Sequence, residues 1–378
     1  MNFEKLMDSR LFRSLLSVGI GLILAALLIQ LSGFNAGEAF STAWIGGTGL
    51  QSGPPSSPTD FALGSGHVSL FQLAQSLARV TPLLLCGLAV AIGLRAGLFN
   101  IGGQGQMTVG ALASAAVGMS PIPDAFGLHL ALMILSGGLA GAVWGAIPGI
   151  LKAWRGVHEV ISTIMMNFIG MNLVAYLVSH NLKDASSQNL QTAQIAKGAW
   201  LSPLVAHSNL TEGLALAIIL ALAMSFFLAR TALGFQIRAV GLGAEAAKTA
   251  GISVPKTLVL TMALSGALAG VAGAVEVAGV HHRYVDGVAG NFGFDGIAVA
   301  LLGGLGGGGS ILSAFFFGFL STGSDYMQSL TGVPAPIAVV VQAVVILFVG
   351  IKVLRTKKTK MKMKKEALPE SASKDDTQ

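Results

Sequence analysis

The sequence predicts an all-α protein that crosses a membrane with about ten helices, and three observations lead to this fold class. Of the 378 residues, 53% are hydrophobic and only 11% are charged, and the mean hydropathy is +0.72, a balance that would not keep a soluble surface dispersed. Apolar stretches of about 20 residues recur along the chain, each long enough for a helix that crosses a bilayer. Lysine and arginine residues gather in alternate loops between these stretches.

Ten apolar stretches are expected to span the membrane. They cover residues 15–33, 72–94, 98–119, 127–149, 159–179, 210–229, 257–280, 288–303, 310–329 and 335–353. The first is interpreted as an uncleaved helix, because no small-residue cleavage site follows it at the usual distance. The eighth is short, and the glycine-rich stretch 303–310 (GGLGGGGS) after it is a tight turn, a broken helix or a re-entrant segment.

The positions of the basic residues predict the orientation of the helices. With ten spans and the N-terminus inside, 19 of the 23 lysine and arginine residues lie on the cytoplasmic side, where short basic loops are retained. Residues 1–14 are then a cytoplasmic N-terminus, and 15–355 form the transmembrane domain with a cytoplasmic loop at 230–257. Residues 356–378 are a basic cytoplasmic tail that we expect to be disordered. Two long polar loops are expected to face outward as surfaces for an external partner: 34–71 and 180–209.

The sequence also excludes several classes of function. Cys86 is the single cysteine, so an intramolecular disulfide, a redox pair and a cysteine-rich zinc site are ruled out. The run from Lys357 to Lys365 follows the last apolar stretch and indicates a cytoplasmic membrane anchor, not a nucleic-acid partner. The chain contains neither GxxxxGKS/T nor HExxH, and the isolated pair His281 and His282 indicates a solvated surface. We therefore expect neither an enzyme nor a cofactor in this chain.

Small residues and amides distinguish three of the predicted spans. Glycines at four-residue spacing form a ladder on the fourth span, and the seventh repeats it: Gly137, Gly141, Gly145, Gly149, Gly266 and Gly270. Such ladders let helices pack closely in lipid. Asn100, Gln104 and Gln106 cluster with glycines at the start of the third span, where amides are costly unless they face protein or water. This pattern is typical of a polar substrate site or gate at a broken helix, and the alternative is that the amides only join helices by hydrogen bonds.

Few ionisable residues fall within the predicted spans. They are Arg79, Glu276, Asp295 and Asp325, with Glu159 at the start of the fifth span. A transporter driven by a proton or sodium gradient usually carries carboxylates deep in its bundle. Glu276, Asp295 or Asp325 would be essential in such a secondary transporter, which stays open as an alternative of another class.

The cytoplasmic loop 230–257 contains the most informative soluble segment. Residues 244–250 have high helix propensity, and Gly251 stands where a helix would stop. This pattern predicts a short helix displayed on the inner face of the membrane. Its small residues, including Ala246 and Ala247, would fit a partner's groove. A plain solvent-exposed connector is the alternative.

Four stretches, in this order, resemble one protein family. They are GLFNIGGQGQMTVGA (97–111), HEVISTIMMNFI (158–169), TALGFQIRAVGLGAEAAKTAGISVPK (231–256) and SGALAGVAGA (265–274). They resemble the permease subunits of ATP-binding-cassette (ABC) importers of the branched-chain amino acid, simple-sugar and nucleoside group, and within it the nucleoside-type branch. The resemblance covers about residues 80–355. One departure is that Gly103 and Gln104 stand where many relatives have Ala-Glu, which removes a carboxylate.

The resemblance implies a nucleoside importer permease with a type II-like fold of about ten spans in the bacterial cytoplasmic (inner) membrane. It implies three protein partners besides membrane lipid: a separate ATPase that binds ATP and Mg, a second permease chain that is homologous or identical, and an extracytoplasmic solute-binding protein. The loop 230–257 looks like the coupling segment that transmits closure of the ATPases. The residues that match the family's AA...GI pattern there are Gly241, Ala246, Ala247, Gly251 and Ile252.

The expected path for the solute starts from the amide cluster. Its residues are Asn100, Gln104, Gln106 and Asn167, whose amides would bond ribose hydroxyls or base edges, with Phe99 and Phe168 as apolar walls. The same machine could carry ribose, another simple sugar or riboflavin, because the binding protein usually sets the specificity. A non-transporting membrane scaffold is the remaining alternative, which the broken, amide-rich helices disfavour.

Overall fold

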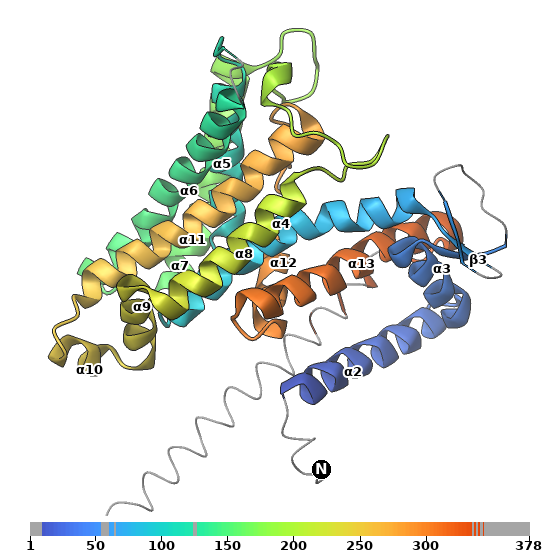
Figure 1. Ribbon diagram of the computed structural model, residues 1–378, viewed down its shortest axis with the longest axis horizontal. Helices are drawn as coiled ribbons and strands as arrows, with labels where there is room; N and C mark the ends of the chain where they lie inside the picture. The colour runs from blue at the N-terminus through green and yellow to red at the C-terminus, as the bar shows by residue number, and fades with distance from the viewer. Residues whose placement is uncertain are drawn as a thin grey trace, which may run out of the picture.

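The computed structural model describes residues 10–53, 60–63, 66–123, 127–334, 336–337, 339–340 and 343. Within these residues the chain forms a bundle of helices with one small sheet (Figure 1). The α-helices are α2 (Arg10–Leu31), α3 (Ala36–Thr48), α4 (Leu70–Arg95), α5 (Gly103–Gly118), α6 (Leu128–Arg155), α7 (Glu159–Leu177), α8 (Gly213–Arg230), α9 (Ala232–Leu242), α10 (Ala244–Thr249), α11 (Val254–Glu276), α12 (Phe292–Leu302) and α13 (Gly307–Thr331). One turn of π-helix extends α7 (η1, Val178–Leu182) and another extends α11 (η3, Val277–His281), and η2 (Lys197–Ala199) is a 3₁₀ turn.

Five helices of the described chain are long and apolar enough to cross a membrane. They are α4, α6, α7 with η1, α8, and α11 with η3, and they match five of the predicted spans. The count of ten is not confirmed, because α5 has 16 residues, α12 has 11, and α13 carries polar residues. The predicted tail 356–378, most of the span 335–353 and residues 1–9 lie outside the described residues.

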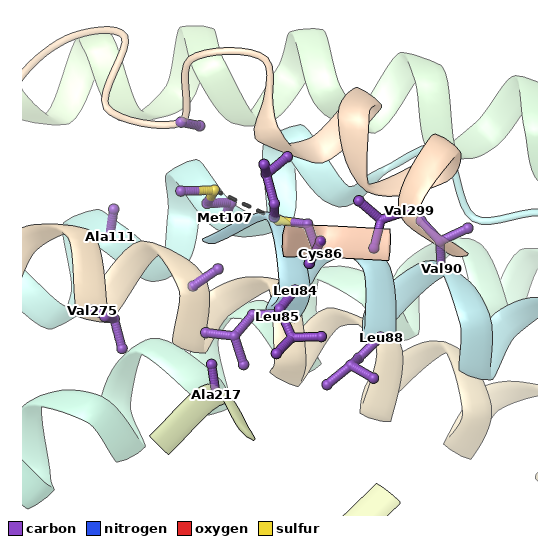
Figure 2. Packing of buried hydrophobic residues seen from close by; sticks show 14 of the residues in the cluster. Leu84, Leu85, Cys86, Leu88, Val90, Met107, Ala111, Ala217, Val275 and Val299 are labelled. Carbon is purple, nitrogen blue, oxygen red and sulfur yellow. Dashed lines mark hydrogen bonds between the residues drawn. The ribbon is translucent and has the colours of Figure 1, made fainter. Parts of the chain in front are cut away.

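Helix α4 forms the centre of the core. From Leu83 to Ile92 its side chains are buried on every side, as expected for a helix that is apolar all round. Figure 2 shows how α5, α8, α11 and α12 contribute to the cluster around it. There Cys86 of α4 donates a weak hydrogen bond from Sγ to Sδ of Met107 at 3.8 Å. The thiol is therefore a packing group between α4 and α5.

The glycine ladder joins α6 to α11, which confirms its predicted role in packing. A Cβ atom at Gly145 would lie 2.5 Å from the carbonyl oxygen of Met262, and one at Gly141 would lie 2.8 Å from Cα of Gly270. Both distances are shorter than side chains tolerate. Gly110 of α5 contacts the same interface between α6 and α11, because a Cβ atom at Gly110 would lie 2.9 Å from the carbonyl oxygen of Gly137. Three helices thus approach with their backbones in contact.

The stretch GGLGGGGS contains a tight turn followed by the start of a helix. Helix α12 ends at Leu302, and Gly304 and Leu305 adopt φ values of +66° and +63° before α13 begins at Gly307. The predicted ninth span therefore begins a turn earlier than residue 310. Before α12, residues 282–291 return into the bundle without helical structure, and Tyr284 in this segment is buried. Helix α12 is thus a half-length helix, about 16 Å at 1.5 Å per residue.

The predicted polar loop 34–71 contains α3 and a three-stranded sheet. The strands β1 (Leu50–Ser52) and β2 (Phe61–Leu63) both pair antiparallel with β3 (Gly66–Val68), which lies between them. Asn35 caps the start of α3, because its side chain accepts hydrogen bonds from two backbone amides, and the helix packs against α13. The sheet lies at the end of the bundle opposite α9 and α10 (Figure 1). We call these the sheet end and the α10 end.

Candidate functional site

A cavity of about 790 Å³ lies in the sheet half of the bundle, between α4, the end of α11, the start of α12 and the second half of α13. Its lining is strongly polar for a membrane protein. The charged and amide residues in it are Gln72, Gln75, Arg79, Asn209, Glu276, Asn291, Asp295 and Asp325, and the hydroxyl residues are Ser321, Thr322, Ser324, Tyr326 and Ser329. Polar groups at this depth are costly unless they serve a solute or one another, so this cavity is the candidate site.

An ion pair crosses one side of the cavity. Arg79 on α4 donates to the carboxylate of Asp325 on α13, and its other terminal nitrogen donates to Oγ of Ser321 at 2.5 Å. The two charged side chains are 37% and 50% exposed, so water reaches the pair. A polar solute that enters the cavity can therefore exchange hydrogen bonds with both partners.

Two further carboxyl groups and an unpartnered hydroxyl border the same space. Glu276 at the end of α11 lies 4.0 Å from Nε2 of His281, and Asp295 lies in the first turn of α12. Oγ1 of Thr322 is buried and has no hydrogen-bond partner among the described residues. Carboxylates and hydroxyl groups accept hydrogen bonds from sugar hydroxyls and amino groups. The cavity thus offers acceptors on one wall and the guanidinium donor on another.

Gln104 holds the segment of chain that forms the floor of the cavity. Its Nε2 donates to the carbonyl of Gly290, and its Oε1 accepts from the backbone N–H of Gly293 at 3.2 Å. Both of these residues belong to the region where the chain enters α12 beside the lining residue Asn291. A neutral amide supplies the donor and the acceptor together, which an ionised carboxylate cannot do. The departure Gly103-Gln104 therefore has a structural use in this chain.

Asn100 is the hub of a buried hydrogen-bond network between α4, α5 and α11. Its Nδ2 donates to Oε1 of Gln106 at 2.9 Å and to Oγ of Ser265 at 2.7 Å, and its Oδ1 accepts from the N–H of Gly102 at 2.8 Å. Ser265 in turn donates to the carbonyl of Ala89 at 2.5 Å. Every polar atom of the Asn100 side chain is thus committed within the protein.

Asn167 makes an equivalent bridge from α7. Its Oδ1 accepts from the N–H of Gly105 at 2.8 Å, and its Nδ2 donates to the carbonyl of Ile101 at 2.9 Å. Phe99 is half-buried, whereas Phe168 is 55% exposed on the outside of the bundle. The geometry favours the helix-joining role for these amides.

The structure places Asn100, Gln106 and Asn167 close together and Gln104 beside the cavity floor, but none of the six expected path residues lines the cavity. Their direct contact with a solute stays a prediction. The four ionisable residues Arg79, Glu276, Asp295 and Asp325 were noticed in the sequence, yet their meeting in one cavity was not foreseen. The only sequence signal was their cost within a membrane.

The segment after α9 contains the predicted short helix, α10. Two hydrogen bonds close its end, from the N–H of Ile252 to the carbonyl of Ala247 at 3.0 Å and from the N–H of Gly251 to the carbonyl of Lys248 at 2.9 Å. This is a Schellman motif, and Gly251 supplies the required positive φ of +83°. Ala247 is buried against the bundle and Ala246 is exposed. The helix and its stop are therefore confirmed.

The junction of α9 and α10 also exposes a residue that the sequence analysis missed. Leu242 is 92% exposed, the largest exposure among the large hydrophobic residues of the described chain. One residue earlier, Gly241 packs against the end of α4, because a Cβ there would lie 3.1 Å from the carbonyl carbon of Ala96.

Comparison with known proteins gives the family. Residues 72–350 match the family model described as "Branched-chain amino acid transport system / permease component". The guanosine ABC transporter permease NupP of Bacillus subtilis is 37% identical over 345 residues, which cover 90% of this chain and 93% of that protein. The nucleoside ABC transporter permease NupB of Lactococcus lactis is 35% identical over 350 residues, which cover 89% of this chain and 90% of that protein. The glucose ABC transporter permease TsgB13 of Haloferax volcanii is 35% identical over 290 residues, which cover 74% of this chain and 76% of that protein.

Proposed function

The chain belongs to the branched-chain amino acid transport system permease family, and on this premise we propose that it forms the translocation path of an ABC importer for nucleosides. It is a multi-pass membrane protein and a transport subunit, not an enzyme. Two relatives that match about nine tenths of the chain carry guanosine or nucleoside in their names, which supports this class of solute.

The polar cavity between α4 and α13 is the observation that carries the proposal. Its volume of about 790 Å³ is adequate for a nucleoside, since small-molecule sites typically measure about 300–1,000 Å³. The carboxyl groups of Glu276 and Asp295 are suited to ribose hydroxyls, and Gln72 and Gln75 to the edge of a base. Phe292 provides an aromatic face in the same lining. A neutral solute of this kind needs many weak polar contacts and no compensating charge.

The proposed cycle is alternating access. The sheet end faces outward, and a solute-binding protein docks on the regions 34–71 and 180–209. The α10 end and both termini lie in the cytoplasm of a bacterial inner membrane, as the positions of the basic residues suggest. A separate ATPase binds ATP and Mg and closes against the coupling segment, so that the cavity opens inward.

In this proposal α10 is the contact for the ATPase, with Gly241, Ala246, Ala247, Gly251 and Ile252 as the coupling residues. Leu242 is exposed beside them and offers apolar surface that the contact would bury. The rigid end of α10 would transmit the push, because α9 packs directly on the end of α4 through Gly241. A second permease chain, identical or homologous, completes the transporter.

A simple sugar is the second candidate solute. A glucose permease matches 74% of this chain at 35% identity, which favours it over other solutes, and riboflavin stays a further alternative. Sugar hydroxyls would use the same acceptors, Glu276 and Asp295. The two candidates differ at the amide wall, because a sugar has no base edge for Gln72 and Gln75 to bond.

The test is uptake of labelled guanosine by cells that carry this permease with its neighbouring ATPase and binding protein. The matched control carries an ATPase that cannot hydrolyse ATP, and unlabelled ribose, glucose and riboflavin serve as competitors. Uptake that needs the ATPase and resists all three competitors supports a nucleoside importer. Uptake that survives loss of the ATPase and is abolished by an uncoupler would contradict the proposal in favour of a secondary transporter. ATPase-dependent uptake of only one of the competitors would support an ABC importer with a different solute.

A further inference from the structure

The large cavity in the sheet half of the bundle carries few positive charges. Among the described residues of its lining, Glu276, Asp295 and Asp325 are acidic, whereas Arg79 is the single arginine or lysine. His281 is the other lining side chain that can become positively charged, and the remaining lining residues are neutral. A solute in this cavity therefore meets at most two cationic groups among the described residues.

Both of these groups already face a carboxyl group. Arg79 donates to the carboxylate of Asp325, and its other terminal nitrogen donates to Oγ of Ser321 at 2.5 Å. Nε2 of His281 lies 4.0 Å from the carboxyl group of Glu276. The positive charge of Arg79 is therefore neutralised within the protein, and the described lining keeps no surplus positive charge for a solute.

An anionic solute would be poorly accommodated by this lining. A phosphate monoester carries about −1.5 to −2 charges at pH 7, and moving it out of water is strongly unfavourable unless it gains a cationic partner. To pair with Arg79, the phosphate would have to displace Asp325 and leave two negative groups side by side. The carboxyl groups of Glu276 and Asp295 supply no positive charge in either protonation state. A neutral nucleoside meets no such penalty, because its polar groups only exchange hydrogen bonds.

We propose that Asp325 is a specificity-determining residue, which neutralises Arg79 so that the cavity accepts nucleosides and excludes nucleotides and other phosphate esters. The role rests on the proposed function, since it requires this cavity to be the solute path. Ser321 holds another side of the guanidinium group, so Arg79 would stay in the lining without Asp325. Its charge would then be free for a phosphate group, which guanidinium is well suited to bind. Removal of one carboxylate should therefore admit an anionic solute.

The experiment measures binding to the purified full-length permease in a neutral detergent, without the binding protein or the ATPase. Equilibrium dialysis gives the dissociation constants of labelled guanosine and labelled guanosine monophosphate, and their ratio is the readout. The variant is Asp325→Asn, and Asp325→Glu restores the carboxylate. Asp184→Asn is the matched control, because it also removes a carboxylate beside an arginine, Arg283, but outside the cavity. Melting temperatures without ligand show that each protein is folded.

We expect the wild type to bind guanosine at least about tenfold more tightly than guanosine monophosphate. In Asp325→Asn this preference should fall at least about tenfold, the effect of one charge-assisted hydrogen bond gained by the phosphate. Asp325→Glu and Asp184→Asn should keep the wild-type preference. The double variant Arg79→Gln with Asp325→Asn should regain it, because the freed guanidinium group is gone. Should Asp325→Asn not fold, Asp325→Ser replaces it.

An unchanged preference in folded Asp325→Asn would overturn the proposal, as would a wild type that binds both ligands equally. A reduced preference that persists in the double variant would also overturn it, since Arg79 would then not be the phosphate partner. Should the wild type bind glucose and not guanosine, the nucleoside assignment fails, and the same ratio for glucose and glucose phosphate decides the role of Asp325. A wild type that binds none of these ligands would overturn both.

Discussion

Arg79 and Asp325 form an ion pair although 246 positions separate them in the chain. The pair joins α4 to α13 at the wall of the cavity, and both side chains are partly exposed there. Exposed ion pairs contribute little to stability, typically about 0–1 kcal/mol. We therefore expect the two charges to matter more for the proposed solute path than as a link between helices.

Replacing Arg79 by Gln should consequently lower uptake much more than stability. We expect an uptake loss of about ten- to hundredfold, the equivalent of one charge-assisted hydrogen bond, and a change of at most about 1 kcal/mol in the free energy of unfolding. Initial uptake rates and thermal melting measure the two effects. The control is Arg155→Gln, an exposed arginine in the last turn of α6 that lies outside the cavity. Normal uptake by Arg79→Gln would contradict the assignment of the cavity as the path.

The two hydrogen bonds of the Gln104 side chain, to Gly290 and Gly293, predict that a small change at this residue destabilises the protein. In Gln104→Glu the ionised side chain cannot donate to the carbonyl of Gly290, so two oxygen atoms face each other. We expect a loss of about 1–3 kcal/mol in stability, together with reduced uptake, because the floor of the cavity is no longer held. Gln188→Glu, the same change at an exposed loop position, should have no effect on melting. Equal melting temperatures of the two variants would argue against a stabilising role for the hydrogen bonds of Gln104.

The close glycine contact between α6 and α11 predicts that adding a single methyl group at this interface destabilises the protein. Gly141→Ala would press a Cβ against the backbone of Gly266 and Gly270, and overpacking of this kind costs about 1–3 kcal/mol. Gly19→Ala is the control, since Gly19 lies within α2 and has nothing within 4 Å of an added Cβ. That change should stabilise the helix by about 0.5–1 kcal/mol. Thermal unfolding in detergent should shift in opposite directions for the two variants.

The Schellman motif at the end of α10 allows a test of coupling. Gly251 has positive φ and open space around it, so Gly251→Asn is tolerated, whereas Gly251→Leu adds strain of about 1–2 kcal/mol and bulk at the surface. We expect Gly251→Leu to insert normally and to hydrolyse ATP with its ATPase, but to move about five- to thirtyfold less solute per ATP. Gly251→Asn should remain near wild type. Unimpaired uptake by Gly251→Leu would count against α10 as the coupling helix.

Asp184 in the loop 180–209 predicts how the stability of this loop depends on pH. Hydrogen bonds from the side chain and backbone of Ser186, together with the charge of Arg283, hold the pKa of Asp184 below its ordinary value of 3.8. A lowered pKa in the folded state means that the carboxylate stabilises the loop above about pH 4, and that this contribution is lost as the pH falls further. Asp184→Asn should melt independently of pH over the range in which the wild type begins to weaken. An identical acid response in both proteins would show that another group is responsible.

Several features were predictable because they depend on residues that are close in the chain. The five long apolar helices could be predicted from runs of apolar residues. The end of α10 could be predicted because an alanine-rich stretch is followed by Gly251. The α6 ladder was readable because a spacing of four places glycines on one helix face. The sheet in the region 34–71 was not predicted, because its three-residue strands are too short to give a pattern.

Local sequence thus determined that this chain is a helical membrane protein, where its long helices lie and where its short surface helix ends, whereas the permease family followed from the resemblance of four stretches to known relatives. Only the tertiary structure decided that Arg79, Glu276, Asp295 and Asp325 border one cavity. It also showed that the amide of Asn100 donates hydrogen bonds to Gln106 and Ser265. The physical reason is that helix formation and membrane insertion respond to runs of neighbouring residues, whereas the partner of a polar group is set by the packing of helices far apart in the chain.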